Sequence, residues 1–176
     1  MQRVVPPASR RPDTLEARGA YLVQIAECVG CHTTTARDGK PLRSMLFGGG
    51  RRFVETRLGY GYEVSPDPSF ASTADPPLGR GERIVTSPNL TADASGISYY
   101  TPELFIQTIR SGKVGRVRQL SSAMPWIYFR NVTDDDLRAI FAYLRSLPPV
   151  RHHVSNTDPP AFCRICGRRH GLGEAN

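Results

Sequence analysis

Two cysteines and a histidine carry the clearest chemical signal in this sequence. Cys28 and Cys31 are separated by two residues, and His32 follows the second cysteine directly. Two thiols at this spacing can each form a thioether with one of the two vinyl groups of a haem, and the histidine is then directed towards the iron. The motif therefore predicts one covalently attached haem c, with His32 as an axial iron ligand.

A redox-active cysteine pair, or half of a zinc site, is the alternative interpretation of the same motif. A thioredoxin-like pair follows a β-strand, whereas no strand pattern precedes Cys28. The haem interpretation also accounts for the histidine, which neither alternative requires at that position.

The second axial position has few candidate ligands. Met124 precedes Pro125, whose restricted backbone gives the thioether a rigid, non-helical approach to the iron. Met45 lies only 13 residues beyond His32, which leaves little chain to pass round the macrocycle. Met124 is therefore the predicted ligand, and the alternative is that its side chain only fills a gap in the core. The remaining candidates are Met1, His152, His153 and His170.

The composition predicts a single domain with much irregular chain. The 176 residues include 16 Gly and 15 Pro, which exceeds average usage. The net charge is +7, but the Lys and Arg residues are scattered, so no nucleic-acid-binding stripe is predicted. No apolar run is long enough to cross a bilayer, and the basic residues near Met1 are not followed by the apolar segment of a secretory signal. Membrane contact is expected only through a partner or through an anchor missing from this sequence.

Three helices are expected to position these residues. Residues 14–27 carry apolar side chains at helical spacing, with Asp13 available as the N-cap, and this helix leads directly into Cys28. A short second helix is expected over residues 101–112. The third begins at Thr133 and has three aspartates in its first turn, where negative charge is favourable to the helix dipole.

Residues 37–89 show no sustained periodicity and are rich in Gly and Pro. A loop of this length is unusual in a compact domain unless it is functional or packs over another feature. We therefore expect a loop insertion at about 40–88. Its aromatic residues Tyr60, Tyr62 and Phe70 either pack at the haem edge or make local contacts on the surface.

The chain from Thr14 to Val150 resembles a monohaem class I cytochrome c domain. The type it resembles most is found in the cytochrome c subunits of membrane-associated bacterial dehydrogenases. Besides the haem motif, the resemblance rests on short motifs in the same order: Gly19-Ala20-Tyr21-Leu22, Ser87-Pro88-Asn89-Leu90-Thr91, Thr101-Pro102-Glu103-Leu104, Ala123-Met124-Pro125, Thr133-Asp134-Asp135-Asp136-Leu137 and Tyr143-Leu144-Arg145-Ser146-Leu147-Pro148.

The resemblance implies an all-α, class I cytochrome c fold in which the first and last helices cross. A small residue at Gly19 would let Tyr143 or Leu144 approach closely. On this basis we divide the chain into an N-terminal extension, a cytochrome c domain that contains the loop insertion, and an irregular Cys/His-containing tail: residues 1–12, 13–150 and 151–176.

The resemblance also implies His32 and Met124 as the two axial ligands, with Asn89 and Trp126 at the haem periphery. Iron ligated on both faces has no open position for a substrate, so the expected function is electron transfer rather than catalysis. The expected partners are a redox protein donor and acceptor, such as a membrane-associated dehydrogenase or respiratory complex. Cytochromes of this type are matured outside the cytoplasmic membrane, which implies a periplasmic or extracytoplasmic location.

Alternatives to a free electron relay stay open. The chain could be a haem enzyme or sensor with a displaceable sixth ligand, although no distal histidine occupies a position comparable to that of Met124. It could also be a fixed cytochrome subunit of a larger redox complex, or an assembly subunit in which haem only stabilises the fold.

A second cysteine pair, Cys163 and Cys166, lies in the tail. A glycine follows this pair where the motif requires histidine, so a second haem site is not predicted. In an oxidising compartment, a disulfide between these cysteines is one expectation. The other is a metal site formed by Cys163, Cys166, His170 and one of His152 or His153.

Overall fold

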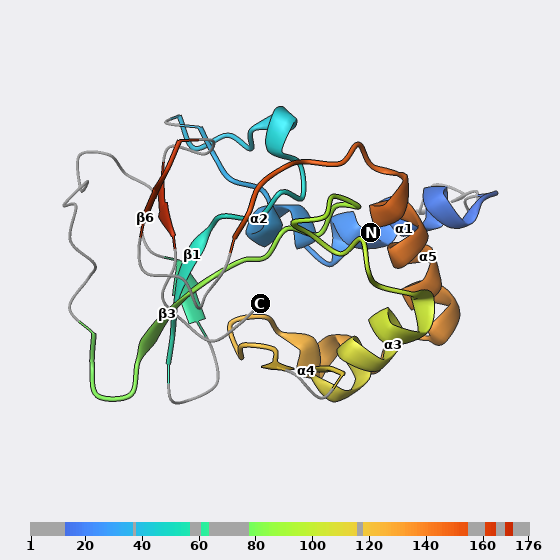
Figure 1. Cartoon of the computed structure of the whole chain (residues 1–176). Coiled ribbons are helices and arrows are strands. Elements are labelled where there is room, and N and C mark those ends of the chain that lie inside the picture. The colour runs from blue at the N-terminus through green and yellow to red at the C-terminus, as the bar shows by residue number, and fades with distance from the viewer. Residues whose placement is uncertain are drawn as a thin grey trace, which may run out of the picture.

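The computed structural model describes residues 13–36, 38–56, 61–63, 78–115, 118–154, 161–164 and 168–170. These ranges contain one short 3-10 helix, Arg43–Met45, and the α-helices α1 (Leu15–Ile25), α2 (Cys28–His32), α3 (Pro102–Ser111), α4 (Trp126–Phe129) and α5 (Asp134–Ser146). They also contain the strands β1 (Arg52–Glu55), β2 (Gly61–Glu63), β3 (Arg83–Thr86), β4 (Lys113–Val114), β5 (Arg118–Gln119), β6 (Ala161–Cys163) and β7 (Arg168–His170). Helices α1, α3 and α5 gather on one side, and β1, β3 and β6 lie on the other (Figure 1).

The prediction of an all-α fold is wrong. The region expected to be a loop insertion, about 40–88, contributes an antiparallel sheet with the strand order β2-β1-β3. Phe53 pairs with Val85 and Val54 pairs with Ile84, so two short runs of aromatic and β-branched side chains stabilise each other across the sheet. The tail, expected to be irregular, also contains the paired strands β6 and β7.

The three helices predicted from the sequence are confirmed as α1, α3 and α5. Asp13, the N-cap predicted for α1, is replaced in that role by Thr14. None of the helices in the described ranges is long and apolar enough to cross a membrane. Each of the three begins after a threonine whose side-chain oxygen accepts a backbone N–H: Thr14 from Ala17 at 3.1 Å, Thr101 from Leu104 at 3.2 Å, and Thr133 from Asp136 at 3.2 Å.

Helices α1 and α5 pack at Gly19. A Cβ atom added at Gly19 would lie 2.0 Å from the carbonyl oxygen of Ala139 and 2.7 Å from the Cβ of Tyr143, so only glycine permits this approach. Of the two residues predicted to approach Gly19 closely, Tyr143 and Leu144, Tyr143 makes the contact. Arg18, next to this crossing, forms an ion pair with Asp136 at 2.6 Å.

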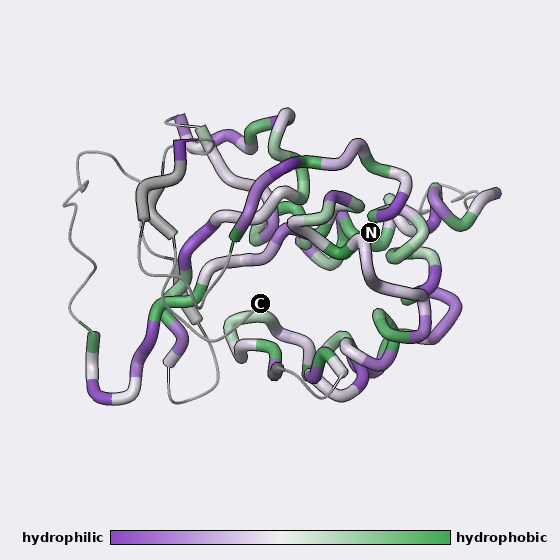
Figure 2. The backbone as a smooth tube through the Cα atoms, viewed as in Figure 1, coloured by the Kyte–Doolittle hydropathy of each residue, from purple (hydrophilic) through white to green (hydrophobic). Residues whose placement is uncertain are grey.

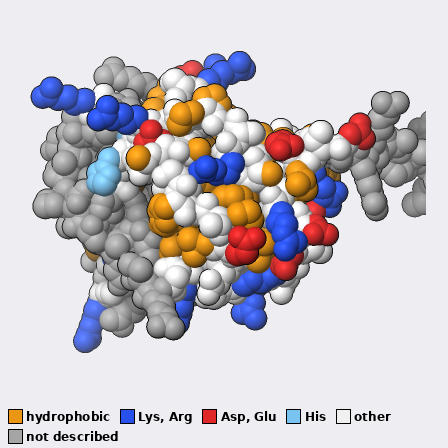
Figure 3. All heavy atoms as spheres, turned by 45° about the vertical axis from the view of Figure 1, so that its right-hand side comes forward, with side chains coloured by type: hydrophobic (Ala, Val, Ile, Leu, Met, Phe, Trp, Pro, Cys, Tyr) orange, Lys and Arg blue, Asp and Glu red, His pale blue; other side chains and the backbone are white. Residues whose placement is uncertain are grey.

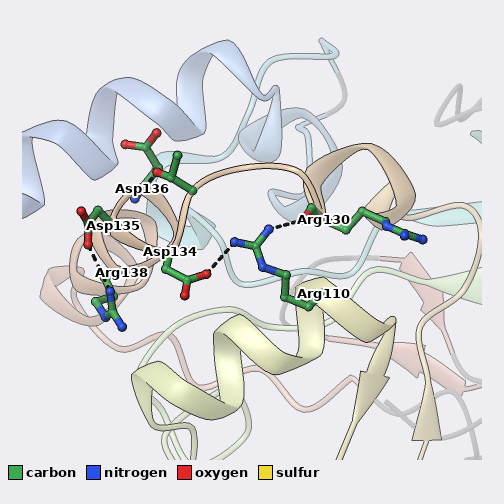
Figure 4. Close-up of polar contacts among 7 residues, drawn as sticks. Arg110, Arg130, Asp134, Asp135, Asp136 and Arg138 are labelled. Atoms are coloured by element: carbon green, nitrogen blue, oxygen red, sulfur yellow. Dashed lines mark hydrogen bonds and ion pairs between the residues drawn. The ribbon is translucent and has the colours of Figure 1, made fainter.

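The beginning of α5 is tied to α3 and to the chain after α4 by Arg110 (Figure 4). The Nη2 atom of Arg110 lies 2.5 Å from a carboxylate oxygen of Asp134, and its Nη1 donates to the carbonyl oxygen of Arg130. Asp135 forms a further ion pair with Arg138 within α5, at 3.1 Å. These contacts hold the beginning of α5 in place.

The hydrophobic core joins the helices to the inserted region. Phe47, from the insertion, is fully buried, and its ring meets that of Tyr143 edge-on at a centroid distance of 6.1 Å. Phe105 of α3 packs on Phe141 of α5 at 5.4 Å. Helices α3 and α5 carry hydrophobic and hydrophilic residues interleaved along their length (Figure 2), as expected for helices with one buried face.

The net positive charge does not gather on the face formed by the helical side of the molecule. On that face, Lys and Arg side chains lie among Asp and Glu side chains, with hydrophobic side chains between them (Figure 3). This mixture agrees with the sequence-based expectation that the cations are scattered.

Candidate functional site

An open cavity of about 760 Å³ is lined by residues of the helices α1, α2, α3 and α5 and of the strands β1 and β3. Its volume falls within the roughly 300–1,000 Å³ that small-molecule and cofactor sites span. The lining is largely apolar and includes Leu22, Phe53, Val85, Ile97, Phe105 and Leu144. Cys28, Cys31, His32 and Met124 all line this same cavity.

The two cysteines of the motif lie on α2, both half-buried and neither in a disulfide. Glu27, between α1 and α2, has a left-handed backbone with φ 55°, so the chain turns sharply just before Cys28. Burial, assisted by the neighbouring Cys31, raises the pKa of Cys28 to about 11. Redox-active cysteines have a lowered pKa, so this environment does not favour the redox-pair interpretation.

His32 is buried, and its Nδ1 atom lies 3.0 Å from the carbonyl oxygen of Pro88. Because a carbonyl oxygen only accepts, Nδ1 carries the proton and donates it, which leaves Nε2 with its lone pair. Burial lowers the pKa of His32, and the hydrogen bond to Pro88 opposes this only in part. The neutral imidazole is the form that ligates a metal, and a hydrogen bond from the other ring nitrogen, such as the one to Pro88, fixes its orientation.

Gly49 packs between the histidine and the segment that holds it. Its N–H donates to the carbonyl oxygen of His32 at 2.8 Å. A Cβ atom on Gly49 would lie 2.5 Å from the carbonyl oxygen of Ser87 and from the carbonyl carbon of Pro88, and the φ of this residue is 72°. Glycine is therefore required here both by the backbone conformation and by the space available.

Met124 reaches the cavity from the chain between β5 and α4. Its N–H donates to the carbonyl oxygen of Ser121 at 3.1 Å, and its own carbonyl accepts from the N–H of Trp126 at 2.7 Å. The structure thus brings Met124 and His32 to one cavity, although they lie 92 positions apart in the sequence.

The other candidate ligands are placed differently. Met45 is buried beneath Gly48 and does not line the cavity. His152 is fully buried, and its Nδ1 lies 2.7 Å from the carbonyl oxygen of Gly48. His153 is exposed and lines the cavity. Met1 and the side chain of His170 lie outside what the structure describes.

The two residues expected at the haem periphery have different surroundings. Asn89 lines the cavity, but its amide also donates to the carbonyl oxygen of Val150 at 2.7 Å and accepts from the N–H of Thr91 at 2.9 Å. It therefore fastens the chain that follows α5. Trp126 does not line this cavity and packs on Gly112, where a Cβ atom would lie 2.4 Å from its indole.

Sequence reasoning missed Glu55 and Arg83, which form a cross-strand ion pair between β1 and β3. Glu55 also accepts two hydrogen bonds from Ser122, two residues before Met124. Glu55, Arg83 and Met124 line a second cavity of about 360 Å³. No local pattern in the sequence predicts the contact between Glu55 and Ser122, because these residues are 67 positions apart.

The tail cysteines stay a prediction. Cys163 ends β6 opposite Arg168 in β7, whereas Cys166 lies outside the described residues, so neither the disulfide nor the metal site is tested. Within the described residues, no group of three or more His, Cys, Asp or Glu side chains is arranged to hold a metal ion. The aromatic residues Tyr60 and Phe70 and the side chain of Tyr62 also lie outside the description.

A largely apolar cavity that joins a C-x-x-C-H motif to a distant methionine is the arrangement expected of a cytochrome c domain. No family model matches the chain. The cytochrome subunit of fructose dehydrogenase from Gluconobacter japonicus is 30% identical over 88% of this chain and 26% of its own length. The cytochrome c subunit of a quinone alcohol dehydrogenase from Gluconobacter oxydans is 27% identical over 78% of this chain and 23% of its own.

A third relative is the cytochrome c subunit of gluconate 2-dehydrogenase from Pantoea cypripedii, which is 27% identical over 84% of this chain and 27% of its own length. The chain spans about a quarter of the length of these relatives. The predicted resemblance to cytochrome c subunits of bacterial dehydrogenases is therefore confirmed, and it supports an electron-transfer function.

Proposed function

We propose that the chain is an electron-transfer cytochrome c domain that holds one haem c through thioethers at Cys28 and Cys31, with His32 and Met124 as the axial iron ligands. The observation that carries this proposal is that all four residues line one largely apolar cavity. Both thiols are free of disulfides, and the histidine presents the tautomer that a metal requires. The donor set and the cavity volume therefore fit a haem.

When bound, the haem supplies an iron that gains or loses one electron at a time. The residues of the chain determine what surrounds that iron. The bond from His32 to Pro88 fixes the imidazole and increases its basicity as a ligand. Met124 would supply the second ligand of that iron and leave no open position for a substrate, and a thioether ligand favours the reduced state relative to a second histidine. Apolar side chains such as Phe53 and Val85 exclude water from the cavity.

The names of the relatives support a dehydrogenase complex as the partner. We infer that the chain receives or delivers electrons as a cytochrome unit of a membrane-associated dehydrogenase or respiratory complex. The same resemblance supports a location on the periplasmic or extracytoplasmic face of the membrane, where haem is attached to such subunits.

A pair of methionine variants tests the ligation. In the purified holoprotein, Met124→Leu should abolish the sulfur-to-iron charge-transfer absorption of the oxidised state and lower the reduction potential. Met45→Leu makes the same chemical change at a buried methionine outside the cavity and should leave both unchanged. A wild-type protein without that absorption, or a Met124→Leu variant that keeps it, would exclude Met124 as the ligand.

A further inference from the structure

The carboxylate of Glu55 joins the inserted sheet to the chain that carries Met124. Its Oε1 atom accepts hydrogen bonds from both the N–H and the hydroxyl of Ser122, each at 2.6 Å. Its Oε2 atom accepts from the guanidinium of Arg83 in the neighbouring strand. One carboxylate is therefore bound by donors from two segments distant in sequence.

The surroundings of Glu55 make these bonds strong. The residue is only 8% exposed, and hydrogen bonds to a charged acceptor in such a place are roughly twice as strong as neutral ones. Burial by itself would raise the pKa of Glu55, but the bonds from Arg83 and Ser122 outweigh it and lower the pKa to about 2. The side chain is therefore a carboxylate throughout the neutral range.

The alternation of side chains along β1 explains why Glu55 reaches the chain that carries Met124. Alternate residues of a strand share one face, so Phe53 and Glu55 of β1 point the same way, as do their partners Val85 and Arg83 in β3. Phe53 and Val85 line the large cavity. Glu55 and Arg83 lie further along the same face and line the second cavity, which Met124 also lines.

Besides the bonds from Ser122, the side chain of Ser121 also hydrogen-bonds to Glu55, and the other bonds described for the segment 121–124 are local. The N–H of Ala123 donates to the hydroxyl of Ser121 at 3.1 Å, and the N–H of Met124 donates to the carbonyl of Ser121. These bonds stay within the segment. On the helical side, the chain is fixed just before it, where the N–H of Leu120 donates to the carbonyl of Gly112 at 2.7 Å.

We propose that Glu55 is a positioning residue for Met124, because its carboxylate holds the segment 121–124 against the sheet and thereby determines how firmly the thioether occupies its axial position. This inference rests on the proposed function, since it takes Met124 as an iron ligand. Weakening the contact at Ser122 should make the thioether easier to displace, while the hydrogen bond from His32 to Pro88 is unaffected.

Displacement of Met124 by added imidazole measures this directly in the oxidised holoprotein. The apparent affinity of imidazole rises with the fraction of molecules in which the thioether has left the iron. Glu55→Gln keeps the size of the side chain but removes its charge. We expect this variant to bind imidazole about tenfold more tightly, which corresponds to about 1.4 kcal/mol. The readout is the loss of the sulfur-to-iron charge-transfer absorption.

Glu82→Gln is the matched control. Glu82 lies in the turn before β3 and accepts only the N–H of Gly79, at 2.8 Å, among the contacts described for it. The same loss of charge there should change the imidazole affinity less than twofold. Ser122→Ala removes one of the two bonds that Ser122 donates to Glu55 and leaves the ion pair with Arg83 in place, so it should strengthen imidazole binding in the same direction but by less.

The outcomes separate this inference from the proposed function. A wild-type protein that lacks the charge-transfer absorption overturns both. A wild-type protein with the absorption, together with equal imidazole affinities in Glu55→Gln and Glu82→Gln, overturns the role of Glu55 alone. Where Glu55→Gln does not accumulate as holoprotein, Ser122→Ala decides, since wild-type affinity in that variant contradicts the inference and tighter binding supports it.

Discussion

The Nδ1 atom of His32 lies 3.0 Å from the carbonyl oxygen of Pro88, 56 residues further along the chain. This bond connects the motif helix α2 to the chain that leaves β3, so the inserted sheet is part of the support of the candidate site. The contact between Glu55 and Ser122 does the same on the methionine side. The sheet β2-β1-β3, which sequence reasoning missed, therefore contacts the segments that carry both predicted axial ligands, His32 and Met124.

The space between His32 and Pro88 can be tested at Gly49. Gly49→Ala would force a residue with a side chain into a φ of 72° and place its Cβ 2.5 Å from backbone atoms of the 87–88 segment. The backbone strain costs about 1–2 kcal/mol and the overpacking about 1–3 kcal/mol. We expect the free energy of unfolding in urea to fall by about 3 kcal/mol.

Gly39→Ala is the control for that variant, because Gly39 has a similar φ of 79° but no atom within 4 Å of an added Cβ. In Gly39→Ala the free energy of unfolding should fall only by the cost of the backbone strain, about 1 kcal/mol. Equal losses of unfolding free energy in the two variants would show that the close approach of Gly49 to residues 87–88 does not contribute to the loss of stability.

The crossing of α1 and α5 makes a second prediction. Gly19→Ala would place a Cβ 2.0 Å from the carbonyl oxygen of Ala139, which cannot move without bending α5. The variant should lose about 3 kcal/mol of unfolding free energy, measured by urea titration of the holoprotein. Gly30→Ala, also on a helix, meets only Glu27 at 3.8 Å and should change stability by less than about 1 kcal/mol. A Gly19→Ala protein as stable as Gly30→Ala would contradict the packing described.

The buried His152 predicts a pH dependence. Burial lowers the pKa of His152 below its ordinary value of 6.5, the hydrogen bond to Gly48 offsets this in part, and the charge of the neighbouring His153 lowers it further. The unfolded chain therefore binds a proton more readily than the folded one, so stability falls as the pH drops below about 6.5. Between pH 7 and pH 5 this residue should account for a loss of at most about 2 kcal/mol.

Unfolding of the holoprotein in urea at several pH values checks this expectation. His152→Asn keeps a donor for the carbonyl of Gly48 but has no titrating ring, so its stability should change less over that interval. Identical slopes in the wild type and His152→Asn would contradict the assignment.

The local parts of the site could be predicted from the sequence, whereas its support could not. The C-x-x-C-H motif needs only neighbouring residues, and the proline after Met124 marks a non-helical approach within two positions. The strands β1 and β3 are four residues each and lie among many Gly and Pro residues, so they show no sustained alternation. The short runs Phe53-Val54 and Ile84-Val85 were the available signal.

Glu55 shows why the rest was out of reach. Its role depends on the register that places it opposite Arg83 and on a contact with Ser122, 67 residues away. A charged residue in a strand otherwise predicts a solvent-facing side chain. Only the assembled sheet shows that this carboxylate is buried and bound on both oxygens.

Mass spectrometry of the proteolytic peptide that contains Cys28 and Cys31 tests the central claim most directly. In protein produced together with a haem-attachment machinery, this peptide should carry the added mass of one haem, and a variant with both cysteines changed to Ala should carry none. A wild-type peptide found with two unmodified thiols would contradict the account.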